Sequence, residues 1–260
     1  MPDDPKLWVA FGTSGLALAG TIYTTIINHR NQNKQDSFKA HAERELATLN
    51  PKLQAERDKR LAQLDAEKII PKFRDPLMHA AYDLQSRIFN IMKQAFLRVY
   101  YANGSPRDKE YAVENTVFLV AQFLGWTEAI RQEIQFLDLA GDDQTRSFRK
   151  LQDNIYTQLQ TDALGSGFRL FAGEQRAVGE LMIDRATGNP GCIGFATFVT
   201  DRKPALDHWL DPLRDDIKRM AIDTKPFEAR LVSIQHSMID LLAFLDPGYV
   251  RFPLSNRTKL

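Results

Sequence analysis

The sequence predicts an all-α fold, in which an N-terminal single transmembrane helix and a charged helical stalk precede a cytoplasmic bundle of about six helices. Two observations lead to this prediction. One is an uncharged apolar stretch near the N-terminus, and the other is the recurrence of apolar residues every three or four positions along most of the chain. The predicted segments are an extracytoplasmic N-terminus at 1–6, a membrane helix at 7–27, a stalk at 28–74, a bundle at 75–248 and a C-terminal tail at 249–260.

The composition is that of a folded protein and argues against several functional classes. Of the 260 residues, 43% are apolar and 26% are charged, and the net charge is +1. A balanced charge offers no basic surface, so we expect no nucleic-acid partner. The single cysteine, Cys192, rules out a disulfide within the chain and fits a reducing compartment.

The predicted membrane span runs from Leu7 to Ile27 and contains no charged residue. At 1.5 Å per residue, a helix of this length reaches about 31 Å, which matches a hydrocarbon core of roughly 30 Å. A cleaved signal peptide is the alternative. That alternative needs a basic start, whereas this chain begins with Asp3, Asp4 and Lys6.

The charges that flank the span predict its orientation. Basic residues follow it, namely His29, Arg30, Lys34 and Lys39 against the single acid Asp36. The positive-inside rule therefore predicts a single-pass membrane protein with its N-terminus outside and its C-terminal domain in the cytoplasm. The lipid bilayer is thus the first expected partner.

Small residues inside the span allow contact between helices. Gly15 and Ala19 stand four positions apart, a spacing that permits two helices to approach closely. A homo-oligomer through Gly15 and Ala19 is therefore one expected assembly, although such pairs also arise by chance.

The stalk at 28–74 carries eleven basic and seven acidic residues, and Asn50-Pro51 is predicted to divide it into two helical runs. Its apolar residues form a thin line: Phe38, Ala42, Leu46, Leu49, Leu53, Leu61 and Leu64. Arg57 interrupts this line, which is too short to predict a coiled coil. The basic excess has two interpretations, attraction to anionic lipid headgroups and a solvated linker helix.

The bundle is predicted to open at Asp75-Pro76. Its first helix ends at the break Asn103-Gly104-Ser105-Pro106. The second helix runs from about Arg107 to Leu139, is followed by Gly141 and is apolar nearly all round over 116–126, so it should be the central one. Four more helices are predicted near 148–159, 168–183, 206–220 and 227–245. The short apolar run within 192–200 is assigned as helix, because a single strand would lack a partner.

Motifs of common catalytic and metal sites are absent from the sequence. There is no GxxxxGK[ST] loop, no His-Glu-x-x-His and no paired Glu-x-x-His helices. Cys192 has no adjacent histidine, and Ser166 lies in no nucleophile elbow. We therefore expect no cofactor and no metal, and we favour a non-enzymatic role over an enzymatic one, with any catalytic residue unknown.

Six polar residues on or beside apolar helix faces are the candidate site residues: Glu128, Arg131, Glu174, Arg176, His236 and Asp240. Buried charges are costly unless they are paired, so these groups need partners. One interpretation is a polar pocket in the bundle, with a glutamate as base and an arginine as anion ligand. The other is a structural ion-pair network, since Glu128 and Arg131 stand three positions apart on one helix.

An anchor, a spacer and a bundle without a catalytic motif favour a membrane-anchored protein that acts through a protein partner, as scaffold, receptor or regulatory subunit. One alternative is an enzyme or small-ligand sensor that uses a polar pocket in the bundle core. Another is a pore or transport component assembled through the anchor.

Overall fold

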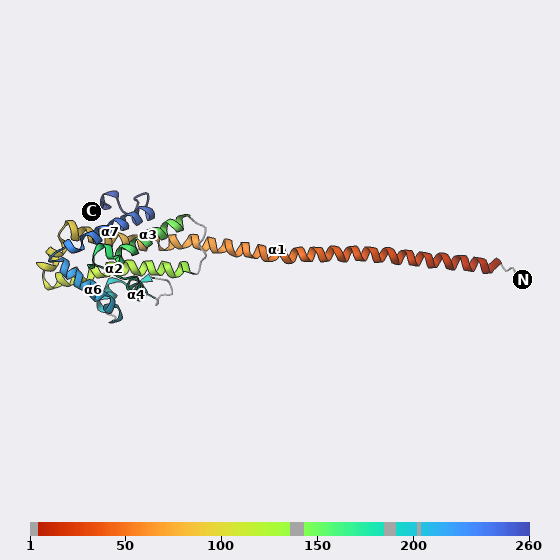
Figure 1. Ribbon diagram of the computed structural model, residues 1–260, viewed down its shortest axis with the longest axis horizontal. Coiled ribbons are helices and arrows are strands. Elements are labelled where there is room, and N and C mark those ends of the chain that lie inside the picture. The colour runs from red at the N-terminus through yellow and green to blue at the C-terminus, as the bar shows by residue number, and fades with distance from the viewer. Residues whose placement is uncertain (1–4, 136–142, 185–190, 202–203) are drawn as a thin grey trace. The chain divides into compact units, whose positions relative to one another are not determined.

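The computed structural model describes residues 5–135, 143–184, 191–201 and 204–260 of the chain, which are coloured in Figure 1. For several helical stretches, among them 5–23 and 62–71, it describes the backbone without the side chains. The chain divides into two units, Met1–Leu61 and Ala62–Leu260.

The first unit consists of the N-terminal part of α1 (Pro5–Lys93), so helix covers the predicted span and stalk. Within the part of the chain that the structure describes, no helix is long and apolar enough to cross a membrane. The predicted span at 7–27, including Gly15 and Ala19, lies mostly where side chains fall outside the description. It therefore stays a prediction.

The predicted helix boundaries at Asn50-Pro51 and Asp75-Pro76 are wrong, because α1 continues through both prolines. A proline removes one backbone hydrogen bond, but its fixed φ suits a helix. Strong helix formers surround Pro51 on both sides, and they favour continuation. Around Pro76, Phe73 and Leu77 are buried in one core, and this packing supports the helix.

The second unit is a helical bundle, as predicted, and after α1 its described residues contain six further α-helices. These are α2 (Pro106–Gln135), α3 (Asp143–Gln160), α4 (Ala172–Met182), α5 (Phe195–Thr200), α6 (Pro204–Met220) and α7 (Glu228–Leu245). A π-helical turn, η1 (Arg98–Ala102), and three 3₁₀ turns, η2 (Asp162–Leu164), η3 (Lys225–Phe227) and η4 (Leu254–Asn256), connect or follow them. The predicted helix end at Leu139 and Gly141 lies outside the described residues.

Local chemistry fixes the start of α2, one residue before the predicted one. The Ser105 backbone N–H donates to Oδ2 of Asp108 at 3.0 Å, and the Asp108 N–H donates to the Ser105 hydroxyl at 3.3 Å. This reciprocal pair satisfies two backbone donors that a helix start leaves free. Pro106 then occupies the first helical position, where it has no N–H to lose.

α2 is the central helix, as its all-round apolar middle predicted. It packs against α4 and α6, while α3 packs along α7 (Figure 1). Val117 and Leu124 of α2 are fully buried. Gly179 allows α4 to approach α2 closely, since a Cβ there would lie 2.7 Å from Cβ of Glu128 and 2.8 Å from the Leu124 carbonyl oxygen.

Two short strands were not predicted. β1 (Ile183–Asp184) pairs antiparallel with β2 (Gly191–Cys192), with Ile183 opposite Cys192. The helix predicted near 168–183 therefore ends at Met182. Cys192, which was assigned to a helix because a strand there would lack a partner, lies in a strand that pairs with β1. Two residues per strand are too few to produce a readable alternation. The rest of the ambiguous run is helix α5, as expected.

Candidate functional site: a polar groove beside the C-terminal strap

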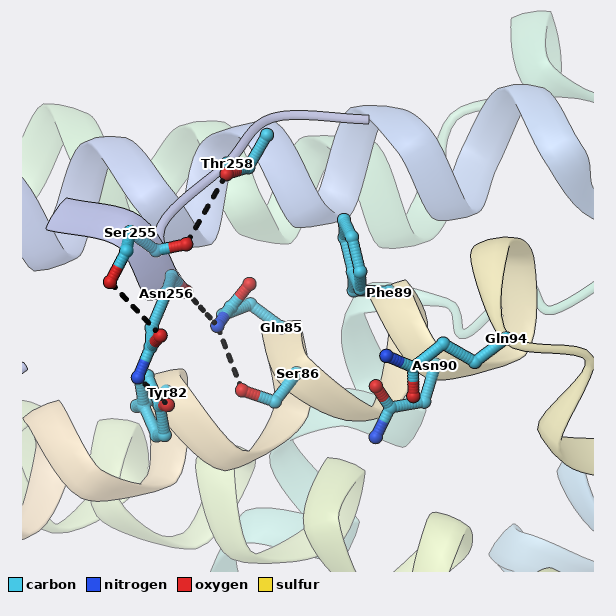
Figure 2. Close-up of a pocket in the computed structure, with 9 residues that line it drawn as sticks. All are labelled: Tyr82, Gln85, Ser86, Phe89, Asn90, Gln94, Ser255, Asn256 and Thr258. Carbon is cyan, nitrogen blue, oxygen red and sulfur yellow. Dashed lines mark hydrogen bonds between the residues drawn. The ribbon is translucent and has the colours of Figure 1, made fainter. Parts of the chain in front are cut away.

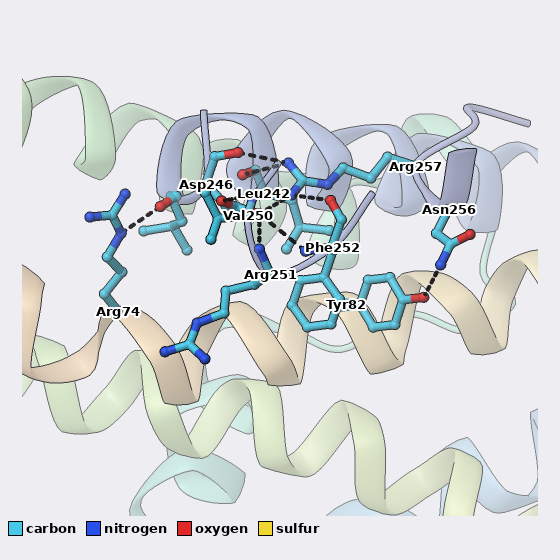
Figure 3. A network of polar contacts seen from close by, with 10 residues as sticks. Arg74, Tyr82, Leu242, Asp246, Val250, Arg251, Phe252, Asn256 and Arg257 are labelled. Atoms are coloured by element: carbon cyan, nitrogen blue, oxygen red, sulfur yellow. Dashed lines mark hydrogen bonds and ion pairs between the residues drawn. The ribbon is translucent and has the colours of Figure 1, made fainter. Parts of the chain in front are cut away.

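The residues predicted as a tail fold back onto the bundle, and we call residues 246–260 the C-terminal strap. Asp246 fixes its turn, because its carboxylate accepts hydrogen bonds from the backbone N–H groups of Val250, Arg251 and Phe252 at 2.9, 3.1 and 3.2 Å (Figure 3). Burial alone would raise the pKa of Asp246, but these hydrogen bonds and the one from Arg257 lower it below its ordinary value.

Arg257 locks the strap to the end of α7. Arg257 as a whole is 4% exposed, and its guanidinium forms an ion pair with Asp246. It also donates to the carbonyl oxygens of Leu242 at 3.2 Å and Phe252 at 2.7 Å (Figure 3). Both terminal nitrogens of this buried guanidinium find acceptors, while its Nε finds none among the described residues. The contacts of the terminal nitrogens hold this part of the strap in place.

Aromatic and amide contacts join the strap to α1. The Phe252 ring stacks on the Tyr82 ring, with centroids 3.8 Å apart and an interplanar angle of 9°. The Asn256 amide donates to the Tyr82 hydroxyl at 3.2 Å, and the Gln85 amide donates to the Asn256 carbonyl oxygen at 3.1 Å. The strap thus lies along one face of the C-terminal part of α1.

A glutamine side chain on α7 binds the main chain at the end of the strap. The Gln235 amide donates to the Thr258 carbonyl oxygen at 2.8 Å and accepts from the Leu260 N–H at 3.2 Å. A single glutamine therefore pairs with the backbone of alternate residues of an extended segment. Since both contacts involve main-chain atoms, this recognition depends little on the side chains of the segment.

A groove of about 200 Å³ opens between α1 and the strap (Figure 2). Its lining residues are Tyr82, Gln85, Ser86, Phe89, Asn90, Gln94, Ser255, Asn256 and Thr258. The lining consists of amides, hydroxyls and one apolar ring, and it includes no charged side chain. The side-chain amides of Asn90 and Gln94 make no hydrogen bond to any described residue, so each offers a donor and an acceptor to a ligand.

The chemistry of this groove suits binding more than catalysis. Side-chain amides and hydroxyls can pair with neutral polar groups, such as the main chain of a peptide. Its lining has no carboxylate, imidazole or amine to act as acid or base near neutral pH. The groove is therefore a candidate recognition site for an uncharged polar surface.

The polar residues singled out from the sequence lie elsewhere. Glu128 is fully buried in α2 and accepts two hydrogen bonds from Arg131, from Nε and Nη2, both at 2.6 Å. Gln132 donates a third, at 2.9 Å. The Glu128 carboxylate is thus neutralised by its own helix, as the ion-pair interpretation expected.

Glu174 has a different structural role. Its carboxylate accepts from the Phe171 N–H at 2.7 Å and so caps the start of α4. Arg176, two residues further on, is exposed. Neither residue lies in the groove.

His236 and Asp240 hold the end of the strap. Nε2 of His236 lies 3.1 Å from the Leu260 backbone oxygen, and Lys259 forms a half-exposed ion pair with Asp240 at 2.5 Å. The six predicted residues therefore do not form one site. Glu128 and Arg131 pair directly, and Arg176 acts electrostatically on Tyr156 of α3, as that pair does. His236 and Asp240 contact the end of the strap instead.

A second polar region lies on α3, near Glu128. The Tyr156 hydroxyl and the Gln152 amide nitrogen are buried and find no hydrogen-bond partner among the residues described. Burial raises the pKa of Tyr156 to about 12, and the charge of Glu128 adds to this effect. Gln152 and Tyr156 stand four residues apart and so share a helix face.

Arg230 is a buried functional group that the sequence interpretation overlooked. It is fully buried on α7 and donates to the carbonyl oxygens of Gln158, Leu159, Thr161, Gly165 and Gly167 at 2.5, 3.0, 2.7, 2.6 and 2.9 Å. A signal was present, since Arg230 interrupts the apolar stripe of Phe227, Leu231 and Ile234. Its role here is to complete the end of α3.

Neither a metal centre nor a reactive thiol is found within the described ranges. No group of three or more His, Cys, Asp or Glu side chains there could hold a metal ion. Burial raises the pKa of Cys192 to about 12, which keeps the thiol protonated. Comparison with family models, curated proteins and solved structures found no match to this chain.

Proposed function

We propose that this chain is a membrane-anchored helical protein that acts by binding a partner protein, with the groove between α1 and the C-terminal strap as its recognition site. The observation that carries the proposal is the pair of free amides, Asn90 and Gln94, in a groove whose walls are otherwise hydrogen-bonded. A scaffold, receptor or regulatory subunit needs such a preformed surface and no acid–base group.

The anchor rests on the sequence. The uncharged segment 7–27 has the length of a bilayer core, and the basic residues that follow it favour a cytoplasmic bundle. The partners in this proposal are the lipid bilayer, a protein, and a second copy that contacts through Gly15 and Ala19. Nucleic acid is not among them, since the net charge is +1.

Two measurements test location and orientation. Alkaline extraction should leave the chain in the membrane fraction, and protease added outside sealed cells should leave the bundle intact. Release by alkali would contradict the anchor, and digestion of the bundle from outside would contradict the orientation.

A cross-linking experiment tests partner binding through the groove. The full chain, the double variant Asn90→Ala with Gln94→Ala, and the control Lys93→Ala are cross-linked in their membranes and recovered. Lys93 is exposed on the same helix but does not line the groove. Any cross-linked partner should be lost from the double variant alone, and equal recovery from all three would contradict the role of the groove.

The buried polar atoms of α3 favour a second candidate function, a small-ligand sensor. Tyr156 and Gln152 offer buried hydrogen-bonding groups near the ion pair of Glu128 and Arg131, as a polar binding site would. If this is their role, Tyr156→Phe should abolish ligand-induced stabilisation without lowering the melting temperature of the free chain. If they are structural, the melting temperature itself should change.

A further inference from the structure

The first unit exposes large apolar side chains that nothing in the described chain covers. Phe38, Leu46, Leu49 and Leu53 are 78%, 56%, 47% and 53% exposed. We call these four residues the stalk stripe. In the second unit the corresponding positions of the same helix, such as Leu77 and Leu84, are almost fully buried.

The stalk stripe lies on one face of α1. Its members follow one another at intervals of eight, three and four residues. At about 100° per residue, all four fall within an arc of roughly 80°. Arg57 continues the same face and ends the apolar run. The stripe therefore forms a continuous seam over about 15 residues, or roughly 23 Å of helix.

The exposed part of α1 gains no stability from packing within the described chain. Most helical stability in proteins comes from packing of an apolar face rather than from helix propensity. Every described side chain from 27 to 61 is exposed, so none of them is packed within the chain. His41 Nδ1 and a carboxylate oxygen of Glu45 lie 4.0 Å apart in solvent, and such surface contacts contribute little.

We propose that a second copy of this chain covers the stalk stripe, with the two helices parallel and in register. The inference rests on the proposed membrane anchor. Two copies that leave the bilayer through the same span do so at the same height, which sets Leu49 opposite Leu49 and Leu53 opposite Leu53. Two copies therefore place identical stripe residues at the same distance from the membrane. A different protein would need apolar residues with the same spacing and at the same distance from the membrane.

The bilayer also compensates for the shortness of the seam. A seam of about 15 residues, or roughly two heptads, is too short to hold two free helices together stably in solution. Chains confined to one membrane meet at a raised effective concentration, which converts a weak contact into a populated one. The pairing is therefore expected in membranes.

Cysteine cross-linking in membranes tests this pairing. In the full chain, Leu53→Cys places a thiol on the stripe. The matched control Ala55→Cys places one about 200° away, on the exposed opposite face. Cys192 is half-buried and its pKa is raised to about 12, so it competes little for oxidation. Mild oxidation should give at least about fivefold more disulfide-linked dimer from Leu53→Cys than from Ala55→Cys.

A second pair of variants repeats the comparison at another level. Leu46→Cys lies on the stripe, and Thr48→Cys lies on the opposite face. Adding Leu49→Glu to Leu53→Cys should reduce its dimer yield several-fold, because a carboxylate would then lie in the seam. Equal yields on both faces, monomer from all variants, or an adduct whose mass is not that of a dimer would each overturn the proposal.

The same samples separate this inference from the proposed function. A chain that fractionates with the membrane but shows no stripe-specific dimer would overturn the pairing and leave the anchor intact. A chain found in the soluble fraction with a stripe-specific dimer would overturn the anchor and support the pairing.

Discussion

One helix, α1, lies in two contrasting environments. Between 27 and 61 its described side chains are all exposed, whereas Leu77, Ala81, Leu84 and Ile88 further along are each at most 2% exposed. Both stretches carry apolar residues at helical spacing, although those of the exposed stretch form a thinner line that Arg57 interrupts. The contrast shows that periodicity identifies a helix face, while the rest of the chain determines whether that face is covered.

The largest effect that the contrast predicts concerns arginine. Arg230→Ala should lower the free energy of unfolding of the bundle by about 3–5 kcal/mol, because it removes a buried guanidinium that donates to five carbonyl oxygens. Arg57→Ala, in the exposed stretch, should change it by less than about 0.5 kcal/mol. Denaturant titration of both variants measures the difference. Similar small values would mean that the Arg230 network is not a main source of stability.

Leucine gives the next largest effect. Leu84→Ala leaves a cavity in a packed core and should cost about 3 kcal/mol of bundle stability. Leu49→Ala removes the same atoms from an exposed site and should leave the unfolding transition of the bundle unchanged. Thermal melts followed by near-ultraviolet circular dichroism report mainly on the bundle, which contains most of the aromatic residues. A large loss for Leu49→Ala would show that the stretch 27–61 is covered by the bundle itself.

Close packing inside the bundle predicts a smaller effect at Gly179. Gly179→Ala would bring a methyl group to 2.7 Å from Cβ of Glu128, so α4 must move away from α2. We expect a loss of about 2 kcal/mol. Gly173→Ala, where no atom lies within 4 Å of the added Cβ, is the control and should be neutral or slightly stabilising. Equal melting temperatures for the two variants would contradict close contact between α2 and α4.

The smallest effect is expected at the strap. Because the folded-state pKa of Asp246 is lowered, its carboxylate stabilises the folded chain at pH values above the ordinary pKa of 3.8. This contribution is lost as the pH falls through the lowered pKa. Asp246→Asn should therefore cost about 1.5 kcal/mol near neutral pH. The gap between variant and wild type should close in strong acid. If the difference in free energy of unfolding between variant and wild type stayed constant with pH, the stabilisation would come from packing and not from charge.

Much of the fold could be predicted, because most helices of the bundle have strong apolar periodicity. The central position of α2 and the helix of α7 follow from residues such as Val117, Leu124 and Leu241. The predicted breaks at Pro51 and Pro76 failed because a helix can tolerate one missing hydrogen bond when its flanks favour helix or are packed. The strands β1 and β2 were too short to leave a pattern.

The groove could not be predicted in this way. It forms where Gln85 meets Asn256, residues 171 positions apart, and no local pattern encodes that contact. The pairing of Glu128 with Arg131 was anticipated, because both lie on one helix turn. The roles of Asp246 and Arg257 depend on how the strap folds back, which only the assembled structure reveals.

Arg230 also has a consequence for cooperativity. The last carbonyl oxygens of α3 have no donor within their own helix, and the guanidinium that donates to them belongs to α7, about 70 positions later in the chain. The end of α3 is therefore completed only when α7 has docked, and it is lost when α7 leaves. In native-state hydrogen exchange, the amides in the last turn of α3 and those around Arg230 should open together, with one shared free energy.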